Sequence, residues 1–158
     1  MKKIFLLVAF IATALTQKTF AQDGTTSQTP SLLSIYYDIK NALVSGNAAA
    51  ASSKAEEFVT TLNGTDFKAV DGSVREALLK DAGHISKTKD IKHQREHFAV
   101  FSTNMYALVK AVKLTSEPIY YDYCPMQKAY WLSSEAAVKN PYYGSAMLTC
   151  GKVQETLK

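Results

Sequence analysis

Apolar side chains recur at spacings of three and four residues in four stretches of the first 113 residues, which is the pattern of helices with one buried face. Turn-forming residues separate these stretches, so we expect short connections between antiparallel helices. The apolar positions are Leu32, Tyr36, Ile39 and Leu43; Ala51, Ala55, Phe58 and Leu62; Val74, Leu78 and Ile85; and Phe98, Phe101, Met105, Leu108 and Val112.

Capping residues indicate where three of these helices begin. Thr29 precedes Pro30 and is a candidate N-cap for the first helix, because proline is favoured at the first helical position. Ser73 and Glu76 have the spacing of a capping box for the third helix. Asp90 can cap the fourth and longest helix.

The pattern changes from about residue 114. Pro118–Tyr123 is typical of an extended segment, whereas Ser133–Lys139 could form a brief helix. The tail from Met147 to Lys158 shows no clear periodicity. We therefore predict an all-α fold, an antiparallel four-helix bundle with an irregular C-terminal cap, in one domain over residues 30–158.

The first 21 residues have the features of a cleavable secretory signal peptide. Met1–Lys3 is basic, Ile4–Leu15 is apolar but too short to span a bilayer, and Thr19–Ala21 offers small residues at the cleavage positions. Residues 22–29 are small and polar and are predicted to form a disordered leader. We therefore expect a periplasmic protein, with no membrane span in the mature chain, in a compartment that permits disulfides.

The apparent basicity of the chain comes mostly from that signal peptide. Of 18 basic and 14 acidic residues in total, Lys2, Lys3 and Lys18 leave with it and no acid does, so 15 (18 − 3) bases face 14 acids. Recognition of nucleic acid needs a basic patch, so we exclude nucleic acid as a partner.

Motifs of nucleotide-binding proteins, metalloproteases and serine hydrolases are missing from the sequence, which predicts that the protein is not an enzyme.

Sulfur ligands occur in two short units of the predicted cap. Cys124 and Met126 are two residues apart, and Met147 and Cys150 are three residues apart. Thiolates and thioethers select soft cations, above all Cu(I). The residues alone favour a structural disulfide between Cys124 and Cys150 over a metal site, with both methionines filling the core.

Two histidines form a second candidate group. His93 and His97 are four residues apart, so they lie on one face of the predicted fourth helix and could bind one metal ion. The positive end of the helix dipole disfavours imidazolium, which keeps His93 neutral and able to coordinate. The alternative is a pair of half-exposed histidines bonded to their neighbours. His84 lies near a predicted helix end and is a weaker candidate.

The C-terminal half resembles a bacterial exported family of unknown function, whose members occur alone or attached to membrane-fusion proteins of Cus-type copper/silver efflux systems. The segment between Met126 and Trp131 is shorter here than in many relatives. The matching stretches are Asp90–Phe98, Tyr121–Met126, Trp131–Ser133, Asn140–Gly144 and Met147–Gly151.

This resemblance implies heavy-metal handling in the cell envelope. It favours one soft-metal site for Cu(I), with silver or zinc as further candidates, in a buffer or chaperone whose partner is an efflux membrane-fusion protein. The alternative is a metal-free envelope interaction module with a Cys124–Cys150 disulfide. The predicted ligands are Cys124, Met126, Met147 and Cys150, with His97 and His93 beside them.

Overall fold

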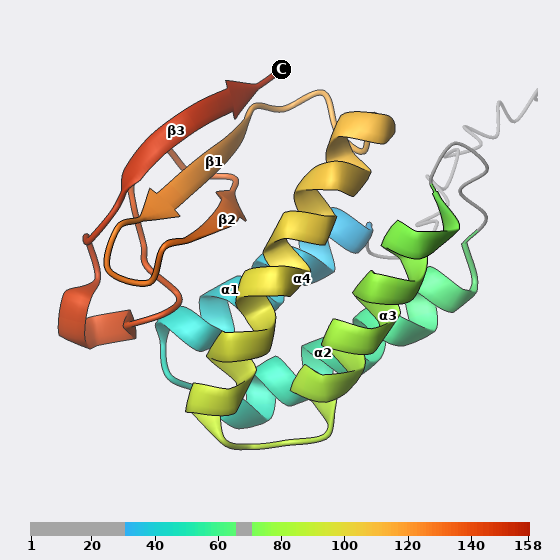
Figure 1. The fold of residues 1–158 in the computed structure, drawn as a ribbon, viewed down its shortest axis with the longest axis horizontal. Coiled ribbons are helices and arrows are strands. Elements are labelled where there is room, and N and C mark those ends of the chain that lie inside the picture. Colours follow the sequence, from blue (N-terminus) through green and yellow to red (C-terminus); the bar gives the residue numbers. More distant parts are fainter. Residues whose placement is uncertain (1–30, 66–70) are drawn as a thin grey trace, which may run out of the picture.

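The computed structural model describes residues 31–65 and 71–158, so the predicted signal peptide 1–21 and leader 22–29 lie outside the described residues. Four α-helices are followed by a three-stranded antiparallel sheet (Figure 1). The elements are α1 (Leu32–Val44), α2 (Ala48–Asn63), α3 (Gly72–Ser86), α4 (Ile91–Ala111), β1 (Ile119–Cys124), β2 (Ala129–Ser133), a 3₁₀ helix η1 (Gly144–Met147) and β3 (Lys152–Leu157).

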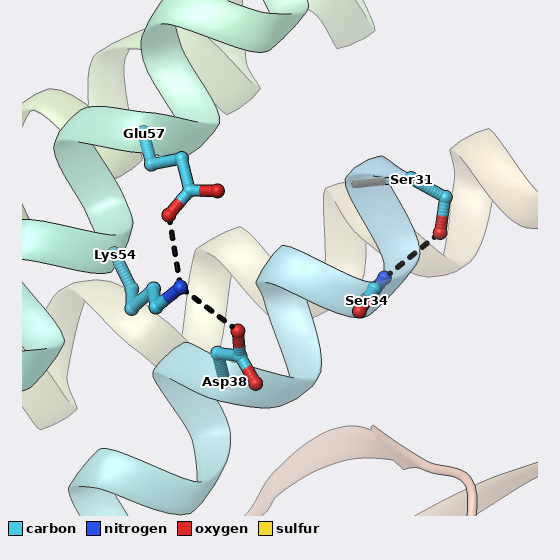
Figure 2. A network of polar contacts seen from close by, with 5 residues as sticks. All are labelled: Ser31, Ser34, Asp38, Lys54 and Glu57. Atoms are coloured by element: carbon cyan, nitrogen blue, oxygen red, sulfur yellow. Dashed lines mark hydrogen bonds and ion pairs between the residues drawn. The ribbon is translucent and has the colours of Figure 1, made fainter. Parts of the chain in front are cut away.

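Short polar side chains cap the helices, and one of the predicted caps is replaced by another residue. The Ser31 hydroxyl accepts the N–H of Ser34 at the start of α1, and the predicted cap Thr29 lies outside the described residues (Figure 2). Asp71 caps α3 through the N–H of Ser73, in place of the predicted capping box. The predicted Asp90 cap of α4 is present and accepts two backbone N–H groups.

The predicted all-α fold is wrong, because the C-terminal part contains a sheet of order β2-β1-β3. The segment predicted as extended is β1, but its two pairing partners were not recognised. The outer strand β3 is short, mostly polar and largely exposed, so it carries no alternating apolar pattern. The predicted brief helix over Ser133–Lys139 is also wrong, since these residues end β2 and then form bends.

The sheet is joined to the helices by a buried tyrosine. The Tyr36 hydroxyl on α1 lies 2.7 Å from the Ser102 hydroxyl on α4 and accepts the backbone N–H of Leu132 on β2 at 3.0 Å. Tyr36 itself is fully buried and stacks on Phe98 of α4. One side chain therefore links two helices and the sheet, and satisfies a buried backbone donor that would be costly to leave unpaired.

A surface ion pair connects α1 and α2 on the side shown in Figure 2. The Lys54 ammonium on α2 lies 3.2 Å from a carboxylate oxygen of Asp38 on α1 and 2.9 Å from one of Glu57. These side chains are more than a third exposed, so water screens the interaction and each pair contributes about 0–1 kcal/mol. The apolar contacts below them hold the helices together.

Because β2 and β3 flank β1 on opposite sides, residues 134–151 must cross β1 to connect the two outer strands (Figure 1). Gly151 lies against the ring of Trp131, where a Cβ atom would be 2.8 Å from Trp131 Cη2, and its φ is +153°. Only glycine fits this close approach without strain.

Across the described part of the chain, every helix is too short or too polar to cross a membrane.

Candidate metal-binding residues

The chain crossing over β1 brings the two cysteines together. Cys124 is the last residue of β1 and is fully buried, whereas Cys150 directly precedes Gly151 and is half-buried. The two side chains are close enough for Cys124 to affect the ionisation of Cys150, and both cysteines are free thiols. Burial raises the pKa of the Cys150 thiol, and the neighbouring Cys124 raises it further. Cys150 is therefore protonated at neutral pH in the absence of a metal ion.

Two N–H donors point at the Cys124 sulfur. The side-chain nitrogen of Asn140 lies 3.2 Å from Cys124 Sγ, and the backbone nitrogen of Gln127 lies 3.4 Å from it. The same Asn140 nitrogen donates to the carbonyl of Cys150 at 2.6 Å. Asn140 thus contacts both cysteines from the crossing segment.

The predicted methionine ligands lie in the two segments that flank the cysteines. Met126 lies in the turn between β1 and β2 and is 62% exposed, so its thioether is accessible from solvent. Met147 ends η1 and is half-buried. Flexible, accessible thioethers can adjust their position toward a metal ion. The structure therefore shows contact within the cysteine pair, with one methionine in each adjoining segment.

All three histidines of the chain form a separate group on α3 and α4. One nitrogen from each of His84, His93 and His97 lies within 4.8 Å of the others. The rings of His84 and His97 stack in parallel with their centroids 4.2 Å apart, and His93 meets His97 edge to face at 4.6 Å. His84 is exposed, and the other two are half-buried. Desolvation and the neighbouring His97 lower the pKa of His84.

A buried carboxylate supports one of these rings. Asp81 on α3 is 6% exposed, and its Oδ1 lies 3.3 Å from Nδ1 of His97. When Nδ1 carries the proton and donates it to Asp81, the lone pair of His97 is on Nε2 and is available to a ligand. This is the arrangement of a carboxylate that orients a metal-binding histidine.

The structure does not bring the histidines to the cysteines. Arg95 on α4 and Tyr142 in the segment between β2 and β3 line the same surface pocket. The side of α4 that carries Arg95 therefore faces the C-terminal cap. His97 is two residues, about 200°, further round the helix and contacts α3. Within residues 31–65 and 71–158, the His, Cys, Asp and Glu side chains that lie close enough for three of them to share a metal ion are those of the three histidines. Neither cysteine belongs to this group. The predicted ligand set is therefore divided between two places.

Sequence reasoning gave too little weight to His84 and did not identify Asp81 or Asn140. The signal for His84 and Asp81 was the short connection between α3 and α4. In an antiparallel hairpin, residues a few positions before the loop lie beside residues a few positions after it, which places His84 beside His93 and Asp81 beside His97. No local pattern identifies Asn140, because its contacts depend on how the chain crosses β1.

Comparison with known proteins gives a family but no function. The model of a family described as "Protein of unknown function (DUF3347)" matches residues 32–117. The matched region runs from the start of α1 past the end of α4, so it contains the histidine group and ends before the sheet and its cysteines. Neither the curated proteins nor the solved structures contain a significant match to the chain.

Proposed function

The chain belongs to this family of unknown function, and we propose that it is a periplasmic protein that binds a soft metal ion, Cu(I) first, as a buffer or chaperone associated with heavy-metal efflux. The observation that carries this proposal is the proximity of the free cysteines Cys124 and Cys150, which share hydrogen bonds from the Asn140 side chain. Two thiolates side by side make a site that selects Cu(I) over harder cations, with silver and zinc as weaker candidates.

The surroundings of the thiols fit this chemistry. Asn140 and the backbone of Gln127 direct N–H groups at the Cys124 sulfur, and such bonds stabilise a thiolate ligand. Met126 and Met147 supply thioethers in the adjoining segments and could complete the coordination of Cu(I). The resemblance to proteins of copper and silver efflux supports the same metal, and an efflux membrane-fusion protein is the partner we propose.

The test is a titration of the reduced protein with Cu(I) in the absence of oxygen, in competition with a chromogenic Cu(I) chelator. We expect one Cu(I) per chain, with a loss of at least tenfold in affinity for Cys124→Ser and a smaller loss for Met147→Leu. Thr149→Ala, an exposed neighbour of Cys150, is the matched control and should bind like the wild type. Because Cys150 is protonated without metal, binding should also release protons.

The alternative function is a metal-free interaction module held by a Cys124–Cys150 disulfide. The contact between the two side chains also favours this possibility, since a disulfide needs the two cysteines to be close. Thiol counting on protein isolated from the periplasm separates the two functions. Two reactive thiols that Cu(I) protects support the copper proposal. No free thiol, together with unchanged Cu(I) affinity in Cys124→Ser and Met147→Leu, would overturn it.

A further inference from the structure

We infer that His84, His93 and His97 form a second metal site, for a borderline divalent ion of the Zn²⁺ class, independent of the cysteine pair. Three neutral imidazoles are a donor set that suits Zn²⁺ and related first-row ions, whereas Cu(I) prefers the sulfur ligands elsewhere in the chain. This inference does not rest on the proposed copper function, because the two groups share no ligand.

The three rings are close to the geometry that such an ion requires. A tetrahedral Zn²⁺ ion with Zn–N bonds of about 2.0–2.1 Å holds its nitrogen ligands about 3.3 Å apart. The three candidate nitrogens lie within 4.8 Å of one another, so they need to approach by about 1.5 Å at most. Rotations of side-chain torsions on two fixed helices can supply this movement.

One ring must turn when the ion binds. The lone pair of an imidazole nitrogen lies in the plane of the ring, and the planes of His84 and His97 are parallel, with an interplanar angle of 4°. One ion cannot lie in both planes. Because His84 is exposed, its ring is free to rotate away from the stack, whereas Asp81 holds the His97 ring. Loss of the His84–His97 stack is therefore part of the binding event.

Asp81 is the second observation that points to a ligand. Its carboxylate is nearly buried at the contact between α3 and α4, and in that position it is aimed at Nδ1 of His97. A carboxylate there fixes the His97 tautomer and leaves the lone pair on Nε2 available to the ion. We assign Asp81 as a positioning residue and the three histidines as the ligands. Three ligands leave a fourth coordination position for water or for a donor from a partner.

The test uses Zn²⁺ and the nitrogen-15 NMR signals of the histidine rings of the purified protein. The chain has three histidines, so every ring signal reports on the site, and the cysteines do not contribute. We expect one equivalent of Zn²⁺ to shift all three sets of ring signals. A parallel titration of the Cys124→Ser, Cys150→Ser double variant should give the same stoichiometry, although its Cu(I) site is lost.

Four variants and one control make the assignment specific. His84→Ala, His93→Ala and His97→Ala should each weaken Zn²⁺ binding at least tenfold. Asp81→Asn should weaken it about 10- to 100-fold while all three ligands remain. Glu96→Gln removes an exposed carboxylate beside His97 and should leave affinity unchanged. Ring signals that do not move with one equivalent of Zn²⁺, or an affinity that survives each histidine substitution, would overturn the inference.

Discussion

Asn140 is the residue whose removal tests the arrangement of the cysteines most directly. It is fully buried and makes four side-chain hydrogen bonds. Its nitrogen donates to Cys124 Sγ and to the Cys150 carbonyl, and its oxygen accepts the backbone N–H groups of Tyr142 and Tyr143 at 2.8 and 3.3 Å. The side chain therefore joins three positions of the crossing segment to one another and to the end of β1.

The cost of Asn140→Ala follows from the groups left without partners. The Tyr142 N–H and the Cys150 carbonyl lose their hydrogen bonds in partly or fully buried positions. Each orphaned buried group costs about 1–3 kcal/mol, so for these two groups we expect the free energy of unfolding to fall by about 2–6 kcal/mol. That is a large part of the roughly 5–15 kcal/mol by which domains are stable.

Urea denaturation of the reduced protein measures this loss. The single tryptophan, Trp131, is buried in the sheet and reports on the cap, while far-ultraviolet circular dichroism reports on the helices. The matched control is Asn104→Ala on α4, whose side chain bonds only within its own helix among the described residues, and which should change stability by less than about 0.5 kcal/mol. A loss below about 1 kcal/mol for Asn140→Ala would refute the reasoning.

Three further changes test the packing and the electrostatics of the fold. Tyr36→Phe removes the acceptor of the Leu132 backbone N–H and should lower the free energy of unfolding by about 1–3 kcal/mol, measured by urea denaturation. Tyr37→Phe, at the half-buried neighbouring position, is the control and should lower it by less than about 1 kcal/mol. Burial raises the pKa of Asp122 to about 6, so its ionisation opposes folding and the contribution of Asp122 to stability falls as pH rises from about 4 through 6. Asp122→Asn removes this ionisation. Between about pH 4 and 6 the free energy of unfolding of the variant should therefore rise by up to about 3 kcal/mol relative to that of the wild type. Urea denaturation at several pH values measures this difference. Gly151→Ala places a Cβ 2.8 Å from the tryptophan ring on β2, which should cost about 1–3 kcal/mol and weaken Cu(I) binding, while Gly72→Ala meets no atom within 4 Å and should be tolerated.

The helical half was predictable because its signals are local. Leu32, Phe58 and Phe101 belong to regular apolar stripes, and the structure buries all three. Asp90 was recognised as a cap because the N-cap bond joins residues two or three positions apart. The predicted capping box at Ser73 was wrong because α3 already begins at Gly72, so Ser73 lies inside the helix and Asp71 is the N-cap that accepts its N–H.

The sheet was not predictable in the same way. Ile119–Cys124 carries a strand pattern, but strand pairing is a contact between distant segments, and Lys152–Leu157 has too few buried residues to show which segment it pairs with. An extended segment without a recognised partner was therefore interpreted as an irregular cap. The pairing also explains the contact between the cysteines, because the connection from β2 to β3 must cross β1.

By itself the sequence determined the helices, most of the core and the residue types that could bind a metal ion, because apolar periodicity and side-chain chemistry are local properties. Only the tertiary structure decided which of those residues meet. The α3–α4 hairpin joins His84 and Asp81 to the predicted histidine pair, and the crossing over β1 joins Cys124 to Cys150. The cysteines lie in the C-terminal cap and the histidines lie on α3 and α4, so the residues predicted to form one site fall into two separate groups.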